Sequence, residues 1–76
     1  MHAETSLDVC GLQSPEPILA LRRHVKALPG GAEFEMRATD AATIHDIPAW
    51  CEQAGHALLM VREEDGTYVF KIRKAA

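Results

Sequence analysis

The feature that most constrains the fold is a regular alternation of two hydrophobic periods along the chain. Residues 34–38 carry an apolar side chain at every second position, which is the period of a strand with one buried face. An earlier segment repeats apolar side chains at intervals of three or four, the period of one helix face, at Ile18, Leu21, Val25 and Leu28. Residues 47–54 repeat the helical pattern, and two further strand-like segments close the chain. The sequence therefore predicts the order βαβαββ.

Turn and capping residues set the limits of the first strand and the first helix. A short strand pattern at residues 7–9 ends at Gly11. Ser14 is a preferred residue type for a helix N-cap, and Pro15 suits the first helical position because its missing N–H costs nothing there. The Pro-Gly-Gly sequence at 29–31 ends the helix.

The second helix has a clear end and an ambiguous start. Its apolar positions are Ile47, Trp50, Cys51 and Ala54. Gly55 is placed to close it in a left-handed conformation. Asp40, Thr43 and Asp46 are all candidate caps. Because Pro48 is tolerated only in the first turn or at a kink, we expect the regular helix from about Thr43 or later.

The end of the chain predicts a β-hairpin. Residues 58–61 form a continuous apolar run, residues 68–73 alternate, and the Asp-Gly pair at 65–66 is a strong two-residue turn signal. A helix between two strands implies a parallel pair, whereas a tight turn implies an antiparallel one. We therefore expect one domain over residues 1–76, an α/β (α+β) two-layer sandwich in which two helices cover one face of a four-stranded mixed sheet. These patterns leave the strand order open.

Size and charge narrow the classes of function. A chain of 76 residues buries only about 60% of its unfolded surface, so we expect its chemistry at the surface. The formal net charge of −3 at pH 7 argues against direct nucleic-acid binding. No segment approaches the roughly 20 apolar residues of a membrane span, and residues 1–7 lack the pattern of a secretory signal. We expect a cytoplasmic protein that is a monomer when free.

The cysteines and histidines give no sign of a disulfide framework, a metal site or a cofactor. Two cysteines are too few to staple a small domain, and in a reducing compartment both are expected as free thiols. Cys51 lies in an apolar helical stripe, which favours a buried, inert thiol. Cys10 lies four residues before Ser14, and its role stays open between a structural residue and a secondary redox or sulfur-handling thiol. The four histidines have no metal-ligand spacing.

The segment from Gly11 to Pro17 concentrates the features of a surface site. It places Ser14 before a Pro-x-Pro sequence and an expected helix start, where unpaired N–H groups and the helix dipole stabilise an anion. Read alone, Ser14 is a plain helix cap. A serine nucleophile with a histidine base is disfavoured, because His24 lies almost three turns along the same helix.

Taken over residues 6–74, the sequence resembles the TusA-like (SirA-like) family of sulfur carriers. Ser14 stands where the family has the Cys of its Cys-Pro-x-Pro motif. The resemblance rests on matching residues in the same order: Leu7, Asp8, Gly11, Leu12, Pro15, Glu16, Pro17, Arg22, Thr39, Asp40, Asp46, Ile47, Pro48, Cys51, Gly55, His56, Leu58, Ile72, Arg73 and Lys74.

The resemblance implies partners and destinations as well as a site. Members of the family receive a persulfide from a cysteine desulfurase or a rhodanese-like donor and pass the sulfur to an acceptor protein, such as a DsrE-like one. Known destinations are tRNA thiolation, molybdenum cofactor assembly and sulfur oxidation, and this sequence does not choose among them. Family polar positions at Glu16, Arg22 and Asp40 are expected to face partners. The charges at 22, 23 and 26 fit a docking face or a solvated helix face equally well.

Serine at position 14 conflicts with the chemistry that the motif implies. A cysteine at a helix N-terminus has a lowered pKa and is more reactive as a thiolate. The hydroxyl of Ser14 is nearly un-ionised at pH 7, and oxygen forms no stable persulfide. We favour an engineered replacement of cysteine, which leaves an inactive Cys-to-Ser variant, because the other family features are retained. The other explanation is a natural member that lost the carrier role. The alternative function is a binding or regulatory module without sulfur chemistry, so enzymatic activity is left undecided.

Overall fold

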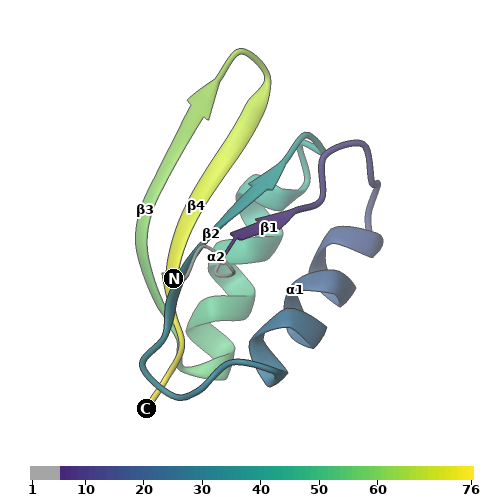
Figure 1. The fold of residues 1–76 in the computed structure, drawn as a ribbon. Helices are drawn as coiled ribbons and strands as arrows, with labels where there is room; N and C mark the ends of the chain where they lie inside the picture. Colours follow the sequence, from purple (N-terminus) through teal and green to yellow (C-terminus); the bar gives the residue numbers. More distant parts are fainter. Residues whose placement is uncertain (1–5) are drawn as a thin grey trace.

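A computed structural model describes residues 6–76 and confirms the predicted order of elements. The two helices lie against the same face of the sheet, which gives the expected two-layer sandwich (Figure 1). Residues 1–5, which include His2 and most of the segment considered above for a secretory signal, lie outside the described residues. The elements are β1 (Ser6–Asp8), α1 (Glu16–Lys26), β2 (Glu33–Ala38), α2 (Thr43–Ala54), β3 (Ala57–Glu64) and β4 (Thr67–Arg73). Across residues 6–76, neither helix has the length and apolar character to cross a membrane.

The sheet is mixed, with the strand order β1-β2-β4-β3. β1 pairs in parallel with β2, and β4 runs antiparallel to both β2 and β3. These directions are the predicted ones. Because the carboxyl ends of parallel strands lie at the same edge of a sheet, the segments that follow β1 and β2 are neighbours. This neighbourhood positions the candidate site.

The core lies between the helices and one face of the sheet. The α1 residues Leu21 and Val25 are buried, as predicted, whereas Ile18 and Leu28 at the ends of the stripe are half-buried. Ala54 is exposed, contrary to its place in the α2 stripe, because it is the last residue of that helix. The large, fully buried side chains of this core are Phe34, Phe70, Leu21, Met36, Ile47 and Ile72. Val69 is also fully buried, on the opposite face of β4.

The start of α1 differs from the predicted one. The helix begins at Glu16, and Pro15 occupies the N-cap position with φ −94°. Ser14 is not the cap and makes no side-chain capping bond. It belongs instead to a tight turn, in which the Glu16 N–H donates to the Gln13 carbonyl at 2.8 Å. A serine cap at position 14 would need the Glu16 N–H as its donor. Because the turn already uses this N–H, Ser14 does not cap the helix, and the helix begins after the turn.

The start of α2 at Thr43 agrees with the prediction, but its cap does not. Ala42 occupies the N-cap, and Asp40 acts from two residues earlier by accepting the Ala42 N–H at Oδ1, at 3.1 Å. Pro48 lies in the second turn, later than predicted. Gly55 closes the helix with φ 85°, a left-handed conformation that glycine adopts without strain, as expected.

Candidate functional site

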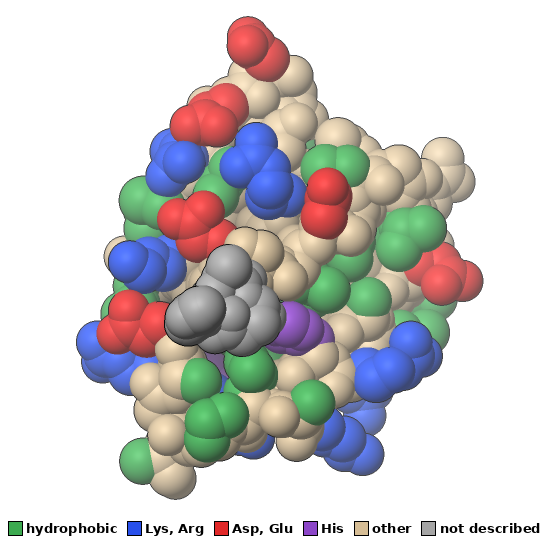
Figure 2. Space-filling view, in the orientation of Figure 1, with side chains coloured by type: hydrophobic (Ala, Val, Ile, Leu, Met, Phe, Trp, Pro, Cys, Tyr) green, Lys and Arg blue, Asp and Glu red, His purple; other side chains and the backbone are tan. Residues whose placement is uncertain are grey.

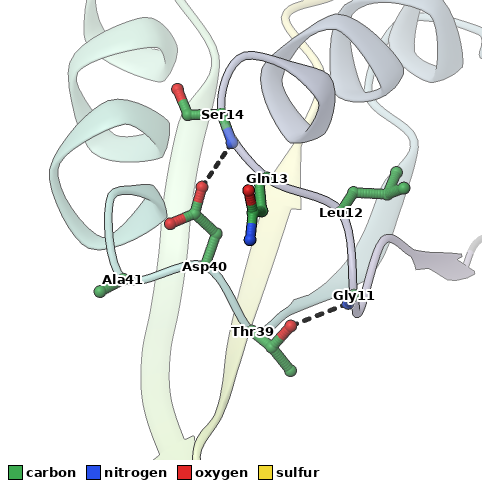
Figure 3. A pocket seen from close by; sticks show the side chains of 7 residues that line it. All are labelled: Gly11, Leu12, Gln13, Ser14, Thr39, Asp40 and Ala41. Carbon is green, nitrogen blue, oxygen red and sulfur yellow. Dashed lines mark hydrogen bonds between the residues drawn. The ribbon is translucent and has the colours of Figure 1, made fainter.

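The candidate site is formed by two adjacent segments, one after β1 and one after β2. Together they line an open hollow of about 540 Å³ at this edge of the sheet. In Figure 3, the side chains of Thr39 and Asp40 in the second segment reach the backbone of the first. The lining residues are Gly11, Leu12, Gln13, Ser14, Thr39, Asp40 and Ala41. The sequence resemblance singled out most of this set, and the parallel pairing of β1 with β2 brings its two halves together.

Two hydrogen bonds from side chains of the second segment hold the backbone of the first. The Gly11 N–H donates to Thr39 Oγ1 at 2.8 Å, and the Ser14 N–H donates to Asp40 Oδ2 at 2.5 Å (Figure 3). Gly11 has φ 87°, so the chain turns there through a conformation that side-chain-bearing residues rarely adopt. The loop that presents Ser14 is therefore fixed near both of its ends.

Ser14 is exposed and lies where α1 and α2 begin. Its hydroxyl points away from the side chains of Leu12 and Gln13 (Figure 3). Ser14 also borders a crevice between the two helices that is too narrow to hold a water molecule. Its other lining residues are Pro17, Ile18, Asp40, Thr43, Asp46 and Ile47. A side chain at position 14 is thus open to a macromolecular partner rather than enclosed in a pocket.

The electrostatic surroundings of position 14 differ from those expected for a simple helix N-terminus. Pro15 and Pro17 have no N–H, and the Glu16 N–H is used by the Gln13 carbonyl. Among the described residues of α1, Ile18 is therefore the first with an amide free to face an anion. The Asp40 carboxylate lies against the Ser14 amide and opposes a second negative charge. The helix stabilises an anion here less than the sequence suggested.

Cys10 is exposed, but its surroundings disfavour a thiolate. The pKa of the Cys10 thiol is raised mainly by its hydrogen bond to the Asp8 side chain, and burial is a smaller cause. The Cys10 N–H donates to Asp8 Oδ1 at 2.9 Å, which lowers the pKa of that carboxyl. Cys10 is not among the residues that line the hollow. Cys51 is buried, as predicted, and burial raises the pKa of its thiol.

The predicted partner-facing residues have two different environments. Glu16 and Arg22 are exposed on α1, whereas Asp40 is half-buried and bonded to backbone amides. Lys and Arg side chains gather over α1, at the lower right of Figure 2. Leu19, Arg22, Arg23 and Lys26 line another surface hollow, and we call this group of four residues the α1 patch. The α1 patch combines positive charge with an exposed leucine, as a docking surface would.

His24 does not pair with Ser14, and the histidines of the described chain are not grouped as metal ligands. His24 packs edge to face on Phe34 of β2, with ring centroids 4.9 Å apart, and burial lowers its pKa. Its position excludes the pairing with Ser14 that a serine nucleophile would need. Within residues 6–76, no three histidine, cysteine or acidic side chains are grouped so that they could hold a metal ion.

Thr39 contributes to the resemblance, but the sequence analysis assigns it no role in the site. Its hydroxyl holds Gly11, yet nothing in the local pattern around Thr39 marks it as part of a site. A topological signal was present, because Thr39 directly follows a strand predicted to be parallel to β1. Residues in that position lie beside the segment that follows the neighbouring strand.

Comparisons with known proteins agree in sequence and in structure. The family model described as "Sulfurtransferase TusA" matches residues 5–74. The chain is 45% identical over 73 residues to the "Sulfur carrier protein TusA" of Pseudomonas entomophila (strain L48), covering 96% of this chain and 91% of that protein. It is 47% identical over 70 residues to the protein of the same name from Pseudomonas putida (strain W619), covering 92% and 88%. The crystal structure of the SirA-like protein from Desulfitobacterium hafniense is similar in fold, with a TM-score of 0.78, 12% identity, and coverage of 93% of this chain and 97% of that one.

Proposed function

Because the chain belongs to the TusA family of sulfurtransferases, we propose that it is built as a sulfur carrier whose carrier position is residue 14. With serine at that position, the chain keeps the docking surface of a carrier but does not accept sulfur there. The observation that carries this proposal is the presentation of Ser14, which is exposed on a loop that two side-chain hydrogen bonds hold in place.

The chemistry of a carrier explains why an exposed, fixed position is suitable. A thiolate at position 14 attacks the outer sulfur of a persulfide on a donor protein, a new S–S bond forms, and the donor cysteine leaves as a thiolate. The reverse sequence of events on an acceptor delivers the sulfur. Both steps need a partner's cysteine to reach the reacting atom, which an open hollow permits and an enclosed pocket would prevent.

The partners that fit this chemistry are proteins with an exposed cysteine. We take the donor to be a cysteine desulfurase or a rhodanese-like protein and the acceptor to be a DsrE-like protein, serving tRNA thiolation, molybdenum cofactor assembly or sulfur oxidation. Glu16 and Arg22 are exposed on the helix that follows position 14 and are our candidates for contacts with these partners. We place the relay in the cytoplasm, where reducing conditions keep the thiols of Cys10 and Cys51 free.

A second candidate function is that of a binding or regulatory module, which binds the same partners without transferring sulfur. It is favoured by one observation, that neither thiol of the described chain is activated. The pKa values of Cys10 and Cys51 are both raised, the first by its hydrogen bond to Asp8 and the second by burial. In this form Ser14 is a functional residue of the module rather than a replaced carrier.

Sulfur loading at position 14 distinguishes the two functions. We expect Ser14→Cys to gain sulfur on incubation with a persulfidated rhodanese-like domain, and peptide mapping to place the added sulfur at position 14. The chain with Ser14 should gain none there. The matched controls are the same two proteins with Cys10→Ala. Equal loading of both proteins at Cys10 would refute the carrier position, and no loading of Ser14→Cys would favour the module.

A further inference from the structure

We propose that Thr39 and Asp40 are positioning residues, which fix the loop carrying position 14 so that a partner's cysteine meets it in one orientation. The inference rests on the proposed carrier function and assigns to Asp40 an internal role in place of the expected partner contact. It is carried by the hydrogen bonds that join two segments 26 and 28 residues apart in the chain.

The loop from Gly11 to Ser14 is held at its two ends. Thr39 Oγ1 accepts from the first amide of the loop at 2.8 Å, and Asp40 Oδ2 accepts from the last at 2.5 Å. The Leu12 N–H donates to the Val9 carbonyl at 3.1 Å. Most backbone N–H groups of the loop therefore have an acceptor. Those of Gly11 and Ser14 bond to side chains, and these two bonds hold the loop against the segment between β2 and α2. Figure 3 shows both of these contacts.

Asp40 is itself anchored to the core through Thr43. The Thr43 hydroxyl donates to the Asp40 carbonyl at 2.6 Å, and Thr43 is only 2% exposed. The second carboxylate oxygen of Asp40 accepts the Ala42 N–H at 3.1 Å. Asp40 would have to give up contacts on both oxygens to turn toward a partner, and hydrogen bonds to a charged group are the stronger kind. The carboxylate is thus committed to the loop and to the start of α2.

The positioning role has a functional consequence that a general structural role lacks. Transfer between two proteins requires the two sulfurs to meet in line, and a misplacement of about 1 Å can cost about a hundredfold in rate. A small persulfide can approach from many directions and does not depend on the loop being fixed. Loss of the hydrogen bonds should therefore slow transfer from a protein donor far more than transfer from a small donor.

Amide hydrogen exchange in the chain with Ser14 tests the geometry without any sulfur chemistry. We expect Thr39→Val to speed exchange of the Gly11 N–H by about tenfold, the effect of losing one hydrogen bond, whereas Thr39→Ser keeps the hydroxyl and the protection. Asp40→Ala should do the same at Ser14 and Ala42, and Asp40→Asn, whose side chain has one acceptor oxygen in place of two, should keep protection at only one of these two amides. Unchanged exchange at Gly11 and Ser14 overturns the proposal. Equal acceleration at the core strand residues Met36 and Phe70 also overturns it, because the change would then be a global loss of stability.

Sulfur transfer to Ser14→Cys tests the functional half. We expect Thr39→Val to reduce the rate from a persulfidated rhodanese-like domain by about tenfold or more, with the rate from glutathione persulfide within about twofold of its starting value. Thr39→Ser should restore the first rate. Thr67→Val at the start of β4 is the matched control, because it is the same substitution at a residue that does not line the hollow. It should leave the ratio of the two transfer rates unchanged.

The two proposals fail in different ways. If Ser14→Cys accepts no sulfur from either donor, the carrier function is refuted while the exchange data still decide the geometry. If Ser14→Cys is loaded and Thr39→Val slows both donors equally, the carrier function stands and the positioning role is refuted.

Discussion

Replacing Leu21 with alanine tests the packing that holds α1, and with it the site, against the sheet. Leu21 is 0% exposed between α1 and the sheet, so its truncation removes buried methyl groups and leaves a cavity. Such changes cost roughly 3–5 kcal/mol, and we take about 3 kcal/mol for this position. At roughly 0.05–0.15 kcal/mol per residue, the stability of the whole domain is about 4–11 kcal/mol. We expect the melting temperature to fall by about 12–24 °C, at about 4–8 °C per kcal/mol for a domain of this size.

The matched control lies two residues earlier on the same helix. Leu19 is 42% exposed and belongs to the α1 patch, so Leu19→Ala should cost less than about 1 kcal/mol. Urea unfolding followed by circular dichroism, with equal m-values for the variants, measures both costs. Similar costs for the two substitutions would contradict the assigned orientation of α1, and would leave the α1 patch without a structural basis.

Three further predictions concern charge and protonation. Arg22→Glu should slow association with a rhodanese-like donor, most strongly at low ionic strength and with an unchanged circular dichroism spectrum, while Arg62→Glu on β3 has little effect in the same stopped-flow assay. Asp8→Asn should speed alkylation of Cys10 near pH 8, because the Asp8 carboxylate raises the pKa of that thiol. An unchanged rate would show that Asp8 does not control the reactivity of Cys10. Burial lowers the pKa of His24, so the unfolded chain takes up a proton first as the pH falls below about 6.5. The free energy of unfolding should therefore decrease from that pH down to the lower pKa of the folded state, and urea titrations of His24→Gln should lack this component.

Much of the fold follows from patterns that act over short distances. The alternation at Phe34 and Met36, the helical spacing of Leu21 and Val25, and the Asp-Gly turn at 65–66 specify elements and buried faces directly. Strand order was not predicted, because a buried face does not reveal which strand is its neighbour. Consecutive apolar residues do not reveal it either. Val69 and Phe70 of the central strand β4 are both fully buried, but the longer apolar run at residues 58–61 lies in the edge strand β3, where Leu59 and Val61 are exposed.

The sequence indicated where the candidate site lies, but it did not predict the hydrogen bonds that hold the loop in place. The resemblance implies that Ser14 is the carrier position and that Asp40 faces partners, whereas in the structure Asp40 accepts a hydrogen bond from the Ser14 N–H. The prediction of Ser14 as a helix cap was wrong, because the turn from Gln13 to Glu16 competes for the same amide. The contact of Thr39 with Gly11 joins residues 28 positions apart, and no local periodicity encodes such a bond.

Sulfur relay with radiolabelled sulfur tests most directly the claim that position 14 is the carrier position on an intact docking surface. The label is supplied on a rhodanese-like donor and counted on a DsrE-like acceptor. We predict that Ser14→Cys delivers label to the acceptor and that the chain with Ser14 delivers none. Because the chain with Ser14 keeps the same docking surface, adding it in excess should reduce the transfer by Ser14→Cys. Transfer of label by the chain with Ser14, or no transfer by Ser14→Cys, would contradict the carrier position.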